Sequence, residues 1–156
     1  MAEGRCRFVT GNLLSLPYAS RTFGIVVSVR LLPHVQAWPR LISELARVAR
    51  HAVIVDYPTS RSLSCLTPAL FGAKKRVEGS TRPYRLFRDA EIVAAFARGG
   101  FVLRERAPQF VLPMVLHRVG KSPAASTVIE GLCGSLGLRR AFGSPIIALF
   151  ERTRMR

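Results

Sequence analysis

Charged side chains stand at the ends of two apolar runs, where they could act on a ligand. The run at 25–29 leads into Arg30, and the run at 52–57 contains Asp56, the only aspartate inside an apolar strand-like segment. Burying an unpaired carboxylate is costly, so we expect Asp56 to reach a partner or a cleft, with Arg30 and Arg61 as candidate partners. Arg30 could also hold an anionic ligand, because a guanidinium binds a carboxylate through two parallel hydrogen bonds.

Three neighbouring residues could contribute to the same site. Leu31 follows Arg30, Tyr57 follows Asp56, and His34 lies in the loop after the first run. A histidine titrates near neutral pH, so His34 could orient a substrate or act as a base. The competing interpretation is structural: Arg30 would be a solvated loop arginine, and His34 an ordinary exposed histidine.

A strand–helix–strand unit would bring these side chains together. The runs at 25–29 and 52–57 are apolar at nearly every position, which is typical of strands covered on both faces. Between them, Pro39 suits the first turn of a helix, and residues 40–50 carry an apolar stripe opposite their arginines. Glu44 can pair with a basic residue on that helix. This order favours a parallel sheet, in which both strands end at one edge.

The rest of the chain predicts further elements of the same sheet. We expect a short strand at 7–10, a helix that begins near Asp89 and closes at Gly99-Gly100, and strands at 101–106 and 146–151. Residues 110–142 are mixed in character and predict one or two helices. The predicted fold class is α/β, with a mostly parallel sheet and an antiparallel C-terminal edge strand.

Composition limits the choice of partners. The formal net charge is +15, which could indicate nucleic acid, an anionic membrane or an acidic partner. The basic residues are nearly all arginine, however, and no basic run carries interleaved aromatics or a recognised module, so we do not expect nucleic-acid binding.

Cysteine usage and hydropathy bear on the cellular compartment. The three cysteines are widely spaced and form no CxxC pair, which argues against a disulfide framework or a zinc site and favours a reducing cytoplasm. No apolar run approaches the ~20 residues that a transmembrane segment needs, and no signal peptide opens the chain.

The order of these pieces resembles the class I S-adenosylmethionine-dependent methyltransferases of the type 11 group. In that family a strand ends in Gly-Asp, then Leu-Pro-Phe follows, and a Phe-Asp pair leads into a strand that runs into Leu-His-His-Val. The corresponding residues here are Gly11-Asn12, Leu16-Pro17-Tyr18, Phe23-Gly24 and Leu32-Pro33-His34-Val35. The family's later helix, which closes in Ala-Gly-Phe, corresponds to Phe87 through Glu91 and Gly99-Gly100-Phe101. The resemblance covers nearly the whole chain and depends on order and spacing.

The resemblance implies a function. It implies a single, partial Rossmann-like methyltransferase domain over 1–156, with 110–142 as a variable lid-like or helical insert. It implies S-adenosylmethionine as the cofactor and a small molecule as the methyl acceptor.

The resemblance also implies roles for individual residues. Asn12 stands where the family has an aspartate that accepts a hydrogen bond from the adenine amino group, and an asparagine oxygen can accept the same bond. The alternative is a turn asparagine that caps its own backbone. Leu13 would offer its backbone N–H to the adenine, and Arg30 and Leu31 would line the cofactor, with Arg30 able to hold its carboxylate.

The remaining implied roles concern the acceptor. Asp56 and Tyr57 would lie on the substrate side, and His34 would be the candidate base.

The family's most specific cofactor motif has no counterpart here. A Gly-rich turn and a ribose-binding carboxylate normally precede the strands recognised above. Gly120-Lys121-Ser122 does not replace them, because Val115 occupies the position of the required earlier glycine. We therefore expect a truncated domain that need not be active alone.

A sheet without its central strand would expose edges and apolar surface, which favours a homo-oligomer or a complementing chain. Two alternatives remain open: a non-catalytic binding or scaffold partner of a complete methyltransferase, and a basic nucleic-acid-binding protein.

Overall fold

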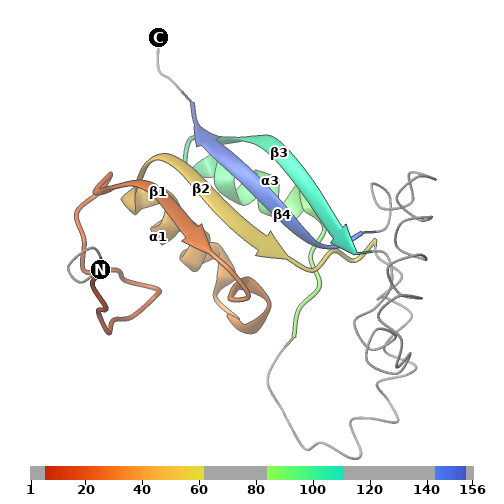
Figure 1. The fold of residues 1–156 in the computed structure, drawn as a ribbon, viewed down its shortest axis with the longest axis horizontal. Helices are drawn as coiled ribbons and strands as arrows, with labels where there is room; N and C mark the ends of the chain where they lie inside the picture. The colour runs from red at the N-terminus through yellow and green to blue at the C-terminus, as the bar shows by residue number, and fades with distance from the viewer. Residues whose placement is uncertain (1–5, 62–83, 111–142, 154–156) are drawn as a thin grey trace, which may run out of the picture.

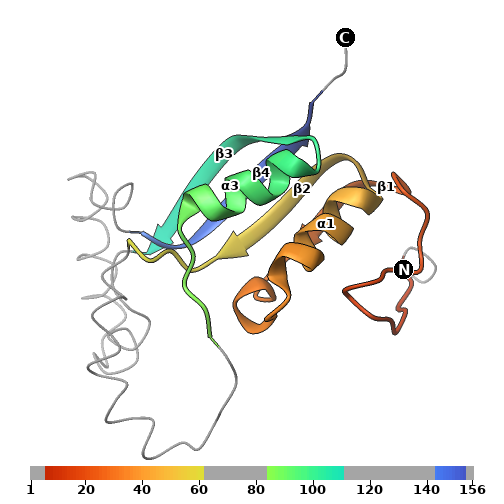
Figure 2. The same cartoon turned by 180° about the vertical axis from the view of Figure 1, so that it is seen from behind.

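A computed structural model describes residues 6–61, 84–110 and 143–153. Its elements, in chain order, are β1 (Phe23–Ser28), the 3-10 helix η1 (Leu32–His34), α1 (Trp38–Val48), β2 (Ala49–Tyr57), α3 (Asp89–Arg98), β3 (Phe101–Phe110) and β4 (Ser144–Arg152). The four strands form one open sheet in the order β1-β2-β4-β3, and both α-helices cover the same face of it (Figures 1 and 2). The α/β fold class is confirmed. The expected insert lies, apart from Phe110, outside the described residues.

The strand–helix–strand unit has the predicted geometry. β1 and β2 are adjacent and parallel, with Ile25 opposite Ala52 and Ser28 opposite Val55. Both strands therefore end at the same edge of the sheet, as the sequence predicted. Helix α1 connects them, and Pro39 occupies its first turn.

The prediction of a mostly parallel sheet is confirmed only in part. Among the described strands β1–β2 is the one parallel pair, because β4 runs antiparallel to both of its neighbours, β2 and β3. The C-terminal strand is also not the edge strand that was expected: it lies inside the sheet, and β3 forms the edge. The apolar character of β4 explains its position, because Ile146, Ala148 and Phe150 are fully buried against the helical layer. β3 tolerates Pro108 because an edge strand has one unpaired side.

The predicted strand at 7–10 is absent. Residues 6–12 have no regular secondary structure, and Phe8 is 96% exposed. A strand is stable only when its backbone groups pair with a neighbour, and no strand in the described part of the chain lies beside this segment. The apolar composition of residues 7–10 predicted a strand, but composition cannot show whether a neighbouring strand is available to pair with it.

The hydrophobic core lies between the sheet and the two α-helices. Phe96 of α3 stacks on Phe150 of β4, with ring centroids 4.1 Å apart, and Trp38 of α1 packs edge-on against Phe87. The fully buried members of this core include Leu41, Ile42, Val53, Val55, Ile92, Phe101 and Ile146. Burial of each such side chain stabilises the fold by roughly 1.5–3 kcal/mol.

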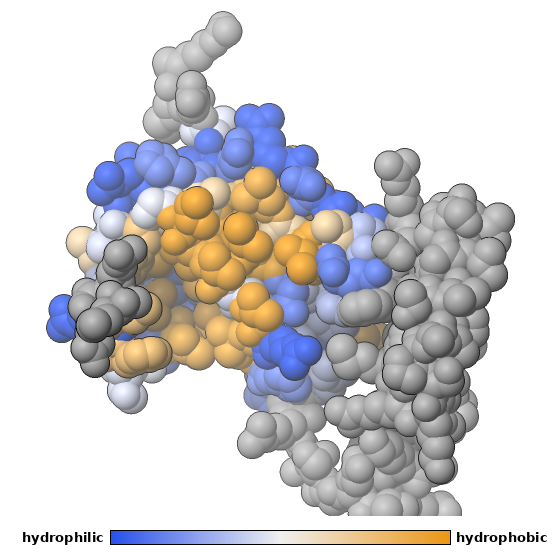
Figure 3. All heavy atoms as spheres, viewed as in Figure 1, coloured by the Kyte–Doolittle hydropathy of each residue, from blue (hydrophilic) through white to orange (hydrophobic). Residues whose placement is uncertain are grey.

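The opposite face of the sheet is apolar and uncovered by helices of the described chain. Ile25, Val27 and Val29 are each about 60% exposed, and Val102 and Ile147 are also exposed. Figure 3 shows a continuous apolar area on the face of the molecule turned toward the viewer. No helix among the described residues is long and apolar enough to cross a membrane.

Candidate functional site

The carboxyl ends of β1 and β2 bring Arg30 and Asp56 together. The backbone N–H of Arg30 donates a hydrogen bond of 2.6 Å to Asp56 Oδ1. Asp56 is only 8% exposed, so this charge-assisted bond supplies the partner that a buried carboxylate requires. The contact is made by the main chain of Arg30, whereas the sequence had suggested its guanidinium.

Arg30 adopts an unusual backbone conformation at this point. Its φ of 56° lies in the left-handed region, which costs an L-residue on the order of 1 kcal/mol or more. The bond to Asp56 fixes the N–H direction and offsets part of that cost. Such locally strained turns at the carboxyl edge of a parallel pair are typical of ligand-binding positions in open α/β sheets.

Tyr84 joins this group, although the sequence analysis did not single it out. Its ring centroid lies 5.7 Å from that of His34. Although Tyr84 is 63% exposed, desolvation of its phenol raises the pKa of the group, and the nearby Asp56 carboxylate raises it further. The backbone of the next residue, Arg85, donates a hydrogen bond to Pro33 O at 3.0 Å and so holds the segment beside the loop after β1. No sequence signal could have found this contact, because 50 positions separate Tyr84 from His34.

Tyr57 lies on the other side of the sheet from Asp56. Side chains alternate along a strand, and Tyr57 is fully buried among the helices, where its ring packs edge-on against Phe87. Its hydroxyl makes no hydrogen bond within the part of the chain that the structure describes. Burial raises the pKa of the phenol strongly, and the charge of Asp89 adds to the effect. Asp89 itself pairs with Arg106 at 2.9 Å. The structure therefore separates Tyr57 from the Arg30–Asp56 contact.

Asn12 and Leu13 lie in an exposed turn. Asn12 Oδ1 accepts a hydrogen bond of 2.9 Å from the backbone N–H of Leu14, which is the geometry of the turn interpretation. The same oxygen can accept a second bond. No hydrogen bond or ring contact among the described residues joins Asn12 or Leu13 to Arg30 or Asp56. Leu31, by contrast, is partly buried and packs against the core.

A partly buried ion pair holds the Asn12 loop on helix α1. The Glu44 carboxylate and the Arg47 guanidinium form two hydrogen bonds of 2.9 Å each. Leu16 N–H donates to Glu44 at 2.8 Å, and Arg47 donates to the carbonyls of Leu16 and Tyr18 at 3.0 and 2.7 Å. The hydrogen bonds from Arg47 lower the pKa of Glu44 to about 2, against the opposing effect of burial. The loop position is thus fixed from the helix.

The described residues contain no metal-binding cluster of three or more His, Cys, Asp or Glu side chains. The groups at this edge are a carboxylate fixed by a backbone N–H, an arginine, and a histidine next to a tyrosine. The Asn12 amide oxygen, with one free acceptor position, lies in the exposed turn. These groups suit hydrogen bonding and orientation of a polar ligand.

Comparison with known proteins identifies relatives of this fold. Residues 1–55 match the family model described as "Methyltransferase domain". No curated protein sequence matches the chain significantly.

Solved structures of methyltransferases match most of the chain. Magnesium protoporphyrin IX methyltransferase from Synechocystis PCC 6803, with bound SAH, shares 17% identity at a TM-score of 0.58, and the alignment covers 94% of this chain and 51% of that one. A proposed methyltransferase from Bacillus halodurans C-125 shares 14% identity at a TM-score of 0.62, over 96% of this chain and 79% of that one. The Haloferax volcanii complex of the Trm112 methyltransferase activator with a proposed methyltransferase matches at 15% identity and a TM-score of 0.59, with coverages of 96% and 62%.

The present chain spans about half the length of the Synechocystis enzyme. In sequence over residues 1–55, and in fold over nearly its whole length, it is similar to the class I S-adenosylmethionine-dependent methyltransferases.

Proposed function

We propose that this chain forms part of an S-adenosylmethionine-dependent methyltransferase that acts on a small molecule in the cytoplasm. One observation carries the proposal. The parallel β1–α1–β2 unit, most of which lies in the family match, ends in a strained turn where Arg30 is hydrogen-bonded to Asp56. Ligands bind at this edge in open α/β sheets.

The described residues fit one side of the cofactor. Asn12 would accept a hydrogen bond from the adenine amino group through its remaining acceptor position, and Leu13 would offer its backbone N–H. Arg30 and Leu31 would line the cofactor where β1 ends, and Asp56 would keep the Arg30 turn in place. The Gly-rich turn that would hold the methionine part has no counterpart in the sequence.

His34 and Tyr84 are the groups available on the acceptor side. The bound cofactor would supply an electron-poor methyl group for in-line displacement by the acceptor. The protein then contributes chiefly alignment and exclusion of water, and His34 acts as a base only if the acceptor must lose a proton. Tyr57 is buried against the helices and would not touch the substrate. It would affect substrate binding only indirectly, by supporting the strand that carries Asp56.

The sheet formed by the described residues has one open edge and one open face. In the described chain β1 pairs only with β2, so one row of its backbone N–H and C=O groups has no strand partner. The apolar face above Ile25, Val27 and Val29 is also too exposed for a finished sheet of this kind. We propose that 1–156 is one partial domain, and that a segment of the same gene product or a second chain supplies the missing strand and cover.

Chemical-shift mapping tests the cofactor proposal even if binding is weak. S-adenosylhomocysteine titrated into the ¹⁵N-labelled chain should perturb the amides of residues 12–14 and 30–31. Asn12→Asp, which restores the acidic residue of the family, should strengthen the interaction, and Asn12→Ala should weaken it. No perturbation at millimolar ligand, or equal affinity of the two variants, would contradict cofactor binding by these residues.

The exposed apolar face favours one second candidate, a scaffold that docks on a complete methyltransferase without binding cofactor. Size-exclusion chromatography with light scattering, with and without such an enzyme, distinguishes the two. A stable complex, together with no chemical-shift change around Asn12 on addition of S-adenosylhomocysteine, would support the scaffold. A stable monomer would contradict both the scaffold and the need for a completing segment.

A further inference from the structure

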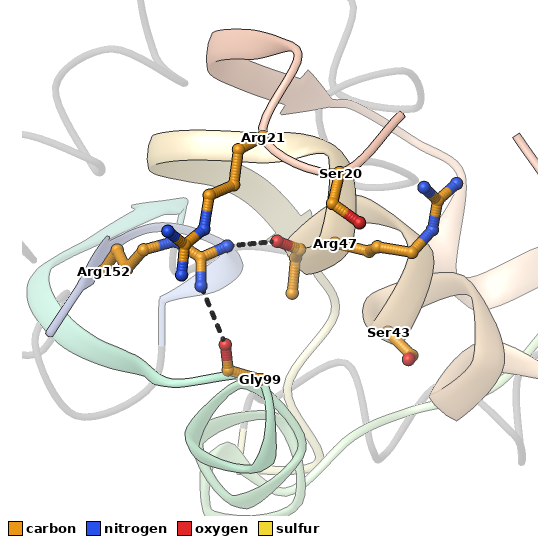
Figure 4. Close-up of a pocket in the computed structure, with 7 residues that line it drawn as sticks. Ser20, Arg21, Ser43, Arg47, Gly99 and Arg152 are labelled. Atoms are coloured by element: carbon orange, nitrogen blue, oxygen red, sulfur yellow. Dashed lines mark hydrogen bonds between the residues drawn. The ribbon is translucent and has the colours of Figure 1, made fainter. Parts of the chain in front are cut away.

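A basic pocket lies at the opposite end of the sheet from Arg30 and Asp56. It has a volume of about 350 Å³ and opens where β1 begins and where α1, α3 and β4 end. Figure 4 shows three arginines and two serines around it, together with the glycine that ends α3. These residues are Arg21, Arg47, Arg152, Ser20, Ser43 and Gly99. None of the residues that line the pocket is acidic.

Two of the three arginines have structural roles. Arg47 is neutralised by Glu44. Arg152 Nη2 donates to the carbonyls of Ala46 and Ala49 at 2.7 and 2.8 Å, so it caps the C-terminal end of α1. Its Nη1 lies 3.5 Å from Gly99 O, and its guanidinium lies 4.5 Å from the centroid of the Phe101 ring.

No carboxylate among the described residues balances the charge of Arg152. Its Nε is buried and makes no hydrogen bond within this part of the chain. Burial lowers the pKa of Arg152, and the positive charge of Arg21 lowers it further. The pocket therefore brings two cations together without an anion between them.

Arg21 is the lining arginine whose side-chain donors have no partner among the described residues. Its backbone is fixed on both sides, because its N–H donates to Arg47 O at 2.8 Å and its carbonyl accepts from Arg50 Nε at 3.2 Å. This fixed backbone has a φ of 59°, an unfavourable value for arginine. The side chain makes no hydrogen bond or ion pair to the described residues, and it reaches toward Arg152 (Figure 4). Substituting a glycine here would relieve the backbone strain.

We propose that this pocket binds a phosphate-sized oxyanion, held by the Arg21 guanidinium and the Ser20 and Ser43 hydroxyls in the positive field of Arg152. A guanidinium presents paired donors that match phosphate oxygens, and hydroxyls supply further donors. The anion would separate the two like charges. The site is distinct from the proposed cofactor edge and does not depend on methyl transfer.

Equilibrium dialysis of inorganic phosphate, at constant ionic strength set with chloride, tests the proposal. Arg21→Gln should bind phosphate at least about tenfold more weakly than the unmodified chain, because a hydrogen bond to a charged group contributes about 1.5–3 kcal/mol. Arg7→Gln is the matched control: it removes the same charge from an exposed residue outside the pocket, and it should bind phosphate normally.

A second variant tests the proposal independently in case Arg21→Gln does not fold. Ser43→Glu places a carboxylate at the pocket from an exposed position of α1, where glutamate is a good helix former, and it should also abolish phosphate binding. Far-UV circular dichroism monitors the fold of each variant. Equal phosphate binding by Arg21→Gln and Arg7→Gln, or binding no stronger than that of chloride, would overturn the proposal.

Two further ligands identify the source of the phosphate. If the pocket binds the backbone of a nucleic acid, Arg21→Gln should weaken the binding of a short oligothymidylate far more than Arg7→Gln does. If it takes a small phosphomonoester, glycerol phosphate should show that difference, and the oligonucleotide should respond equally to both substitutions.

Discussion

The Glu44–Arg47 pair predicts a specific loss of stability on substitution. Glu44→Gln keeps the size of the side chain and an acceptor for Leu16 N–H but removes the charge. Folding lowers the pKa of Glu44 from 4.5 to about 2. That shift corresponds to at most about 3 kcal/mol of stability at neutral pH. A third of the Arg47 side chain is exposed, so screening by water reduces the expected loss to about 1–2 kcal/mol.

The direction of the Glu44 pKa shift determines how the effect of Glu44→Gln on stability depends on pH. The folded pKa lies below the unfolded value, so the charge of Glu44 stabilises the fold above about pH 4.5. Its contribution declines as the pH falls toward 2. The difference in unfolding free energy between the unmodified chain and Glu44→Gln should therefore be constant near neutral pH and shrink in acid.

Urea denaturation measures both quantities. Trp38 is the single tryptophan and is buried against Phe87, so its fluorescence should report unfolding. Glu151→Gln is the matched control, because Glu151 and Arg104 are each about half exposed, and it should cost no more than about 0.5 kcal/mol. If both substitutions had the same small effect, or if the effect of Glu44→Gln persisted at pH 2, the anchoring role of the pair would be refuted.

Two further substitutions test the packing around the two sites. Gly99→Ala would place a Cβ 2.8 Å from Ala46 Cβ, so we expect a loss of roughly 1–3 kcal/mol in urea denaturation, and an unchanged midpoint would contradict the close approach of α3 to α1. Tyr57→Phe removes a buried hydroxyl that has no hydrogen-bond partner among the described residues, so stability should be unchanged or slightly higher. A loss above about 1 kcal/mol in thermal or urea unfolding would show that the hydroxyl is bonded.

Local patterns in the sequence were sufficient to predict the parallel unit at the centre of the candidate site. Continuous apolar runs indicated β1 and β2, and the apolar stripe between them indicated α1, because each pattern depends only on which faces of an element are buried. The need of Asp56 for a partner also followed from the cost of burying a charge. The structure met that need with the main chain of Arg30.

Other features depended on which segments became neighbours. The run at 7–10 has the composition of a strand but no adjacent strand, and β4 lies between β2 and β3 rather than at the edge. Arg21 and Arg152 line one pocket although 130 residues separate them in the chain. A residue's type and spacing determine its local conformation and which of its faces is buried, whereas contacts between distant segments follow from how whole elements pack. For this reason the sequence by itself determined the β1–α1–β2 unit and its polar edge, and only the tertiary structure decided the strand order, the partner of Asp56 and the basic pocket.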